Sequence, residues 1–309
     1  MIAAVHPEAL VRALGRSIVG QRETIESLVL ALIAGGHVLL EGPPGVAKTL
    51  ACRALAAAVG GTFKRIQFTP DLLPSDIVGT RIFDQRTASF TTVPGPIFAN
   101  VVLADEINRA PAKVQSALLE GMQEHRATIG PETHDFPQPF IVLATMNPLD
   151  ADGTYALPMA QMDRFLAKTV LAYPSLDEER AIVDRYDASD PPLPHDVATL
   201  ADVSAWRNEA RAVHISNAVR DYAIALVRET REVNPYVELG ASPRASLALT
   251  GLARARAFLE ERTYVVPEDV RDAAPSVLRH RIALGYRAAT DGVGADRIVL
   301  EAIARVTPP

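Results

Sequence analysis

The hydrophobic residues of this chain follow two different patterns, and the change between them falls near Tyr173-Pro174. Before that point, short apolar runs rich in Val, Ile, Leu and Phe alternate with longer mixed segments. The runs are His37–Leu40, Phe63–Phe68, Asn100–Asp105, Phe140–Thr145 and Ala167–Leu171. Strands that are buried on both faces of a parallel sheet have this composition. The pattern therefore predicts that residues 1–173 form an α/β domain around a five-stranded parallel sheet.

From Pro174 onward the pattern is that of helices. Ser175-Leu176-Asp177-Glu178 is a capping box, in which the serine and the glutamate each satisfy a backbone N–H of the other. Ser242-Pro243 and Val266-Pro267 place a proline at the expected first position of a helix. We therefore predict that residues 174–309 form a small all-α domain.

Two segments of the first part predict hairpins in place of helices. Residues 80–93 form two short strand patterns around a polar turn, and residues 126–137 have a turn signal at Gly130-Pro131. Ordinary surface hairpins remain the alternative to a functional role. Neither hairpin segment is dense in Lys or Arg, so DNA binding by these hairpins is not indicated.

Between the two hairpin segments, Pro111–Glu124 has the pattern of an amphipathic helix. We expect its apolar face to pack on the sheet.

Composition narrows the class of protein. The chain has 309 residues, 48% of them hydrophobic and 22% charged, which is ordinary for a globular protein of two domains. Its net charge of −6 argues against general binding of nucleic acid or anionic membranes, although a local basic patch stays compatible with it. The single cysteine, Cys52, suggests a reducing compartment. No signal peptide is evident, and the uncharged run from Ser27 to Leu40 is too short to span a bilayer. We expect a cytoplasmic protein without membrane insertion.

The clearest chemical motif follows the first apolar run. Gly42-Pro43-Pro44-Gly45-Val46-Ala47-Lys48-Thr49 is a phosphate-binding loop with alanine in place of its second glycine. A strand before it and an alanine-rich helix former after it would direct backbone N–H groups and a positive helix end at polyphosphate. Lys48 would contact the β- and γ-phosphates, and the Thr49 hydroxyl would bind Mg²⁺. A chance turn before a buried helix is the alternative. We predict a negative φ for Ala47, because a left-handed alanine costs roughly 1–2 kcal/mol.

Two adjacent carboxylates, Asp105 and Glu106, end the apolar run that begins at Asn100. In open α/β sheets, ligands bind outside the carboxyl ends of the strands. Asp105 would hold Mg²⁺ through its water shell, and Glu106 would act as the base that orients and deprotonates the attacking water. By itself, an acidic pair after a strand more often marks a solvated loop. We also expect that Gln67, at the end of the second run, can contact Glu106.

These motifs together resemble those of AAA+ ATPases. The chain has the phosphate loop, Ala104-Asp105-Glu106-Ile107-Asn108-Arg109-Ala110-Pro111 and Ala144-Thr145-Met146-Asn147-Pro148. Leu73-Pro74-Ser75-Asp76-Ile77 and Gly240-Ala241-Ser242-Pro243-Arg244-Ala245 narrow the resemblance to the MoxR family, from about Val19 to the end of the chain. The two predicted hairpins are similar to those of the helix-2-insert group, which includes MoxR proteins and resembles magnesium chelatase. The fold that this resemblance implies is an AAA+ core followed by a helical lid.

The resemblance also implies roles for individual residues. Asn147 matches the first sensor, which holds the attacking water; a turn asparagine before proline is the alternative. Arg164 matches the arginine finger, which reaches the γ-phosphate bound by a neighbouring subunit. The alternative for Arg164 is a surface ion pair with Asp163. Arg109 is a second candidate for a contact between subunits. Arg244 matches the second sensor, which connects the helical lid to the nucleotide. The alternative is an ordinary exposed arginine on a helix. The nucleotide contacts implied are Gly20, Gly42, Pro43, Pro44, Gly45, Val46, Ala47, Lys48, Thr49 and Leu50.

The function that the resemblance implies is Mg²⁺-dependent hydrolysis of ATP in a homo-hexameric ring. The energy would drive remodelling or metal-cofactor maturation of client proteins, helped by a protein with a von Willebrand factor A domain. Two alternatives remain: an ATP-dependent assembly switch with little turnover, and a nucleic-acid motor of the minichromosome-maintenance type. The acidic net charge and the lack of an added DNA-binding domain count against the motor.

Overall fold

The computed structural model describes residues 5–146, 155–188 and 193–309. The chain divides into two compact units, and each is assembled from separate stretches of sequence. The first unit comprises residues 1–26, 37–157 and 170–204, and the second comprises residues 27–36, 158–169 and 205–309. The domain boundary predicted after residue 173 stays a prediction.

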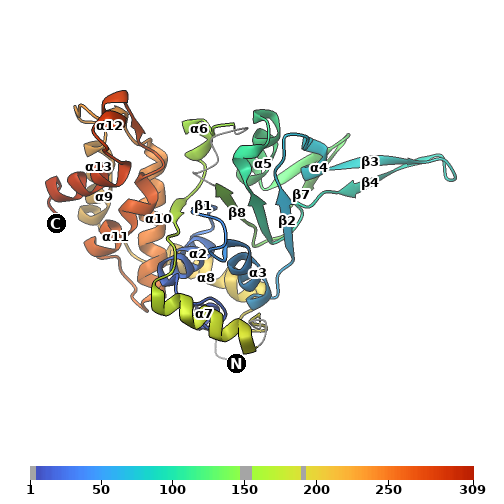
Figure 1. Cartoon of the computed structure of the whole chain (residues 1–309), viewed down its shortest axis with the longest axis horizontal. Coiled ribbons are helices and arrows are strands. Elements are labelled where there is room, and N and C mark those ends of the chain that lie inside the picture. Colours follow the sequence, from blue (N-terminus) through green and yellow to red (C-terminus); the bar gives the residue numbers. More distant parts are fainter. Residues whose placement is uncertain (1–4, 147–154, 189–192) are drawn as a thin grey trace. The chain divides into compact units, whose positions relative to one another are not determined.

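Five strands of the chain form one sheet (Figure 1). Its strands are β1 (Val38–Glu41), β2 (Phe63–Gln67), β5 (Val101–Asp105), β8 (Ile141–Met146) and β9 (Ala167–Val170), in the order β2-β5-β8-β1-β9. The pairs β2–β5, β5–β8 and β8–β1 are parallel. The apolar residues of β1, β5 and β8 are buried, as expected for strands covered on both faces. The predicted α/β class and all five strand positions are confirmed.

Helices of the first unit flank this sheet. They are α1 (Glu8–Ser17), α3 (Lys48–Ala58), α4 (Pro74–Val78), the 3₁₀ turn η1 (Ile107–Arg109), α5 (Ala112–Glu124) and α7 (Leu176–Ala188). Helices α2 (Arg22–Ala34) and α8 (Leu200–Ala212) each contribute residues to both units. On α5 the side chains of Val114, Leu118 and Met122 are buried, so the predicted amphipathic helix is confirmed. The capping box at the start of α7 also forms, with Ser175 N donating to Glu178 Oε2 at 2.8 Å.

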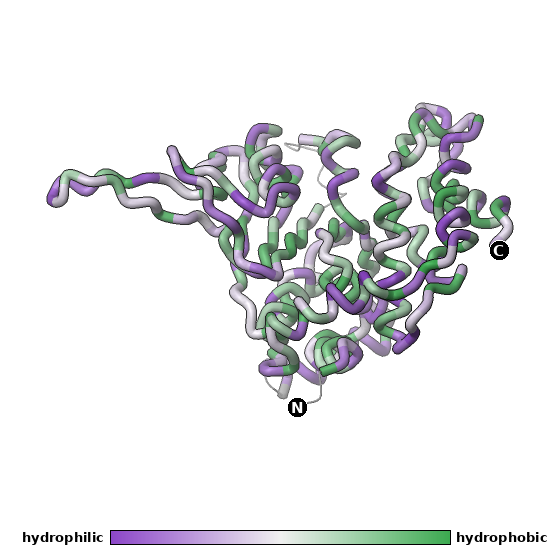
Figure 2. The backbone as a smooth tube through the Cα atoms, turned by 180° about the vertical axis from the view of Figure 1, so that it is seen from behind, coloured by the Kyte–Doolittle hydropathy of each residue, from purple (hydrophilic) through white to green (hydrophobic). Residues whose placement is uncertain are grey.

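Both predicted hairpins are present. One consists of β3 (Gly79–Asp84) and β4 (Ser89–Pro94), and the other of β6 (Arg126–Ile129) and β7 (Glu132–Asp135). The β3–β4 hairpin projects from the first unit, and Figure 2 shows hydrophobic stretches along it. Phe83 and Phe90 form a cross-strand ring pair at 5.0 Å, although both side chains are about half exposed. The hairpins are joined by a hydrogen bond from Thr92 Oγ1 to Glu132 Oε2 (3.2 Å).

The second unit is mainly helical. Its remaining elements are α6 (Met159–Met162), α9 (Asn217–Glu229), β10 (Val237–Leu239), α10 (Pro243–Leu259), α11 (Pro267–Leu278), β11 (Ala283–Leu284), α12 (Tyr286–Thr290) and α13 (Ala295–Arg305). Pro243 and Pro267 begin their helices as predicted, and Trp206 is buried. The all-α prediction is confirmed apart from the short β10–β11 pair, which the sequence did not indicate. Over the described parts of the chain, no helix has the length and apolar character needed to cross a bilayer.

Candidate functional site

The phosphate loop joins β1 to α3, and its backbone corrects one prediction. Ala47 has φ 59° and ψ 21°, which is left-handed, whereas we predicted a negative φ. The prediction placed Ala47 at the start of the helix. Helix α3 instead begins at Lys48, and Ala47 is the residue before it, where the loop turns into the helix. The alanine therefore carries the strain that a glycine would avoid, a cost of roughly 1–2 kcal/mol.

The start of α3 is suited to an anion. Among the described residues, no side chain caps this helix, so its first backbone N–H groups lack an intrahelical acceptor. Gly45 has φ 85°, and a Cβ added to it would meet none of the described atoms within 4 Å, which shows open space beside the loop. Lys48 Nζ donates to Gly42 O at 2.7 Å. Uncapped N–H groups, open space and a lysine folded over its own loop fit the phosphate chain of a nucleotide.

Burial lowers the pKa of Lys48, while the negative charges of Asp105 and Glu106 raise it. Burial prevails, because the pKa as a whole lies below its ordinary value. The two carboxylates are thus close enough to act on the ammonium group electrostatically. The structure therefore brings together the predicted phosphate-binding lysine and the predicted metal and base carboxylates.

Thr145, on the neighbouring strand β8, connects the two carboxylate residues. Its Oγ1 donates to Asp105 Oδ1 at 2.6 Å and accepts from the backbone N of Glu106 at 2.8 Å. The side chain is 1% exposed, so this arrangement is fixed by packing. No motif in the sequence indicated this role. The parallel pairing of β5 with β8 could have indicated it, because Thr145 lies one residue beyond the last register pair, Ala104 with Ala144.

Each carboxylate also has a cationic neighbour. Arg65 on β2 donates to Asp105 Oδ2 through Nε at 3.0 Å and Nη2 at 2.6 Å. Arg109 Nε lies 3.1 Å from Glu106 Oε2. The predicted contact of Gln67 with Glu106 is present, with Nε2 donating to Oε2 at 3.0 Å. The Arg65 pair was not predicted. Arg109, a candidate for a contact between subunits, here contacts the predicted base of its own chain.

Left-handed backbone recurs at the predicted nucleotide-binding segments. Glu106 has φ 56°, and Gly20 and Gln21 have φ 66° and 54°. Gln21 is anchored by Nε2, which donates to Ala172 O at 3.0 Å. The positive φ of Gly20 favours glycine, and a Cβ there would also require the Glu178 carboxylate to shift. Strained residues of this kind persist where surrounding contacts hold them, and they cluster at functional sites.

The second unit contains Arg164 and Arg244, next to one buried ion pair. Asp163 Oδ1 accepts from Arg281 Nε at 2.8 Å, and the Arg281 side chain is only 3% exposed. Asp163 Oδ2 accepts from Ser242 Oγ at 2.8 Å, and the same oxygen of Ser242 accepts from Arg244 N at 3.1 Å. Asp163 is therefore held by Arg281 and Ser242, and Arg164 and Arg244 follow Asp163 and Ser242 closely in the chain. Asn147, the predicted first sensor, lies outside the described residues.

The fold and this site define an AAA+ ATPase. Residues 37–167 match the model of the ATPase family associated with various cellular activities (AAA), and residues 229–302 match that of the AAA lid domain. The chain is 46% identical to Chaperone MoxR1 of Mycobacterium tuberculosis, covering 100% of this chain and 84% of that protein. It is 33% identical to Protein MoxR of Paracoccus denitrificans, covering 88% and 87%. A crystal structure of a candidate ATPase from Cytophaga hutchinsonii matches with a TM-score of 0.91 and 42% identity, covering 98% and 94%. The chain belongs to the MoxR family of AAA+ ATPases.

Proposed function

We propose that this protein hydrolyses ATP with Mg²⁺ in a ring-shaped assembly and uses the energy to remodel client proteins. The observation that carries the proposal is the arrangement of Lys48, Asp105 and Glu106. Thr145, on the neighbouring strand β8, holds both carboxylate residues at the end of β5, and both carboxylates act electrostatically on Lys48. Phosphoryl transfer requires this combination of a phosphate-binding cation, a metal-binding carboxylate and a base.

The residues of this chain would divide the work as follows. The uncapped N-terminus of α3 and Lys48 bind and orient the phosphates, and Thr49 and Asp105 would hold Mg²⁺. The bound metal supplies charge neutralisation on the phosphate oxygens. Glu106 accepts a proton from the attacking water, and Gln67, which donates to its Oε2, orients that carboxylate.

The ring is part of the proposal because Arg164 would act on the nucleotide of a neighbouring subunit. Asn147 would hold the attacking water, and Arg244 would report nucleotide binding to the helical unit. The cluster of Asp163, Arg281 and Ser242 supports this assignment, since it fixes the backbone beside both arginines. A hexamer is the assembly that we expect.

The client-remodelling step is supported by the name of one relative, Chaperone MoxR1 of Mycobacterium tuberculosis. A helper protein with a von Willebrand factor A domain is proposed on the basis of family membership. The half-exposed aromatic pair of Phe83 and Phe90 on the β3–β4 hairpin is an apolar surface of the kind that binds polypeptides.

One observation favours the alternative of a nucleotide switch with little turnover. Asp105 is engaged by Arg65, and Glu106 is engaged by Arg109, so neither carboxylate is poised for catalysis in this conformation. Under the proposed function these contacts must rearrange when nucleotide binds. A switch would keep them.

The substitution Glu106→Gln separates these two functions. We expect steady-state hydrolysis to fall at least about 100-fold, because the base is lost, while ATP binding is retained. Glu120→Gln, an exposed position on α5, is the matched control and should leave the rate unchanged. An equal rate for wild type and Glu106→Gln would refute the hydrolysis mechanism.

Affinity capture with Glu106→Gln in the presence of ATP then tests client remodelling. Recovery of the ATPase alone, without a client protein, would remove the support for remodelling.

A further inference from the structure

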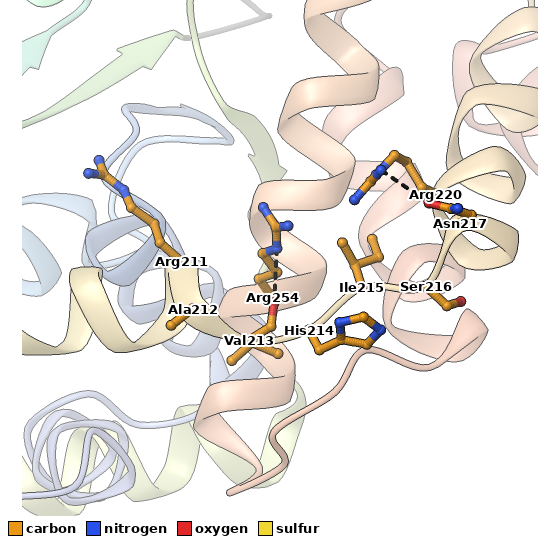
Figure 3. Close-up of a pocket in the computed structure, with 9 residues that line it drawn as sticks. All are labelled: Arg211, Ala212, Val213, His214, Ile215, Ser216, Asn217, Arg220 and Arg254. Atoms are coloured by element: carbon orange, nitrogen blue, oxygen red, sulfur yellow. Dashed lines mark hydrogen bonds between the residues drawn. The ribbon is translucent and has the colours of Figure 1, made fainter.

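A basic depression in the second unit lies between the end of α8 and the start of α9 (Figure 3). It encloses about 480 Å³, which is within the range of roughly 300–1,000 Å³ typical of small-ligand sites. Its lining contains three arginines and one histidine, and no carboxylate: Arg211, Ala212, Val213, His214, Ile215, Ser216, Asn217, Arg220 and Arg254. The proposed catalytic residues are not among them.

The floor of this depression is fixed by backbone pairing. His214 N donates to Thr263 O at 3.0 Å, and Val265 N donates to His214 O at 2.9 Å. Arg254, on α10, is half-buried, and its Nε donates to Val213 O at 3.2 Å. That bond anchors the guanidinium and leaves its two terminal NH₂ groups for another acceptor. In Figure 3 the side chains of Arg254 and Arg220 extend toward the same region above Ile215, while Arg211 points away from them.

The start of α9 adds polar donors to the same region. Ser216 caps this 13-residue helix by accepting from Val219 N. The cap leaves the N–H groups of Asn217 and Ala218 without intrahelical acceptors, at the positive end of the helix dipole. Arg220 Nη1 makes only a long bond of 3.4 Å to Asn217 Oδ1. Guanidinium groups and helix N–H groups therefore converge on one depression.

The charge of these arginines is not compensated within the described chain. Every arginine from Arg256 to Arg305 has a carboxylate within 4.0 Å. By contrast, no described carboxylate makes such a pair with Arg211, Arg220 or Arg254. One turn before Arg211 on α8, burial together with the positive charge of Arg211 lowers the pKa of Arg207 to about 10. An anion bound here would relieve this repulsion between like charges.

We propose that this depression, centred on Arg220 and Arg254, is a binding site for a small phosphorylated molecule. Planar guanidinium groups bind phosphate oxygens in a bidentate manner, and a helix N-terminus contributes further N–H donors. The size of the depression favours a small molecule over a single inorganic ion. Because the site lies in the helical unit and uses none of the residues assigned to hydrolysis, it is independent of the proposed ATPase function.

Titration calorimetry with inorganic pyrophosphate tests this site on the full chain. Lys48→Ala serves as the background, because it weakens phosphate binding at the phosphate loop. In that background, Arg220→Gln should lower pyrophosphate affinity at least about tenfold, the loss expected for one charge-assisted hydrogen bond. Arg228→Gln is the matched control, since Arg228 is an exposed arginine of the same helix outside the depression. It should change the affinity less than about twofold.

Three outcomes would overturn the proposal. The first is the absence of saturable pyrophosphate binding, and the second is an equal loss for Arg220→Gln and Arg228→Gln, which would reveal only general charge attraction. The third is binding of a phosphoserine peptide without binding of pyrophosphate, which would indicate a macromolecular partner. Arg220 is exposed, so its variant should fold, and the fluorescence of Trp206 on heating checks this.

Discussion

Ala47 occupies the left-handed region of backbone space where the phosphate loop turns into α3. The motif identified the loop, but the sign of φ depended on which residue begins the helix, and that boundary is uncertain by a residue or two in any sequence-based prediction. The structure shows that alanine is accepted there in a strained conformation. Its small Cβ makes this possible, and a larger or β-branched residue would not be equivalent.

The substitution Ala47→Val should therefore destabilise the first unit by about 1–3 kcal/mol, because a β-branched side chain is poorly tolerated in the left-handed region. Ala47→Gly removes the strain and should be near neutral, since glycine also gains entropy in the unfolded chain. Ala57→Val, within α3, is the control and should cost no more than about 0.7 kcal/mol. Urea unfolding followed by circular dichroism measures these differences. Equal effects of the two valines would show that backbone strain at Ala47 is unimportant.

Arg65 is the second residue whose role appears only in the structure. It lies two positions before Gln67 on β2, so both side chains are on the same face of the strand, and that face carries Asp105 at its end. The Arg65 guanidinium pairs with Asp105, the carboxylate that would hold a divalent metal. The two cations would therefore compete for one carboxylate.

Replacing Arg65 should consequently strengthen metal binding. For Arg65→Gln we expect the affinity for Mn²⁺ in the presence of ADP to rise about fivefold, near 1 kcal/mol for a partly solvated pair. The decrease of the free Mn²⁺ signal in electron paramagnetic resonance measures this affinity. Lys64→Gln, the adjacent exposed residue of the same strand, removes the same charge and should have little effect. A weaker affinity in Arg65→Gln would mean that Arg65 supports the metal site.

At the scale of elements, local pattern was sufficient for the strands and hairpins. β1, β2, β5, β8 and β9 all lie within one or two residues of the predicted apolar runs, because a buried parallel strand has a distinctive composition. The β3–β4 and β6–β7 hairpins were indicated by their turns. Contacts between distant elements were not predictable in this way. The ion pair of Asp163 with Arg281 joins positions 118 residues apart, and no local pattern carries that information.

This ion pair is expected to hold the turn between α11 and β11 beside the segment that carries Arg164. Asp163→Ala would leave the guanidinium of Arg281 buried without its carboxylate, and we expect a loss of about 3–5 kcal/mol in the stability of the second unit. The single tryptophan, Trp206, is buried in this unit, so urea unfolding followed by its fluorescence reports the change.

Asp177→Ala is a suitable control for this measurement. Asp177 also pairs with an arginine, Arg180, but the two side chains are 91% and 68% exposed. Its removal should cost less than about 0.5 kcal/mol. If Asp163→Ala proved as mild as this control, the carbonyl groups that also accept from Arg281 would be sufficient to stabilise the buried charge.

At the scale of the whole molecule, the sequence supported the class of protein better than the division of the chain. The AAA and lid models match residues 37–167 and 229–302, in the order that the two patterns indicated. The compact units, however, interleave, because residues 27–36 and 158–169 belong to the second unit. Hydrophobic periodicity reports local structure and burial, and it does not report which core a short segment joins. The role that we propose for Arg164 likewise depends on an assembly, so its test requires an experiment on mixed subunits.

Mixing two inactive variants tests whether Arg164 completes the site of a neighbour. Lys48→Ala should abolish nucleotide binding by its own subunit, and Arg164→Ala should abolish its contribution to the next one. In a ring with a head-to-tail interface, an Arg164→Ala subunit next to a Lys48→Ala subunit regains an intact site. Random assembly at equal concentrations should therefore restore about a quarter of the wild-type hydrolysis rate, measured as phosphate release.

Arg109→Ala mixed with Lys48→Ala is the comparison. Because Arg109 contacts Glu106 of its own chain, mixing should not raise the rate above the mean of the two variants measured separately. Recovery with Arg109→Ala, and none with Arg164→Ala, would transfer the finger role to Arg109.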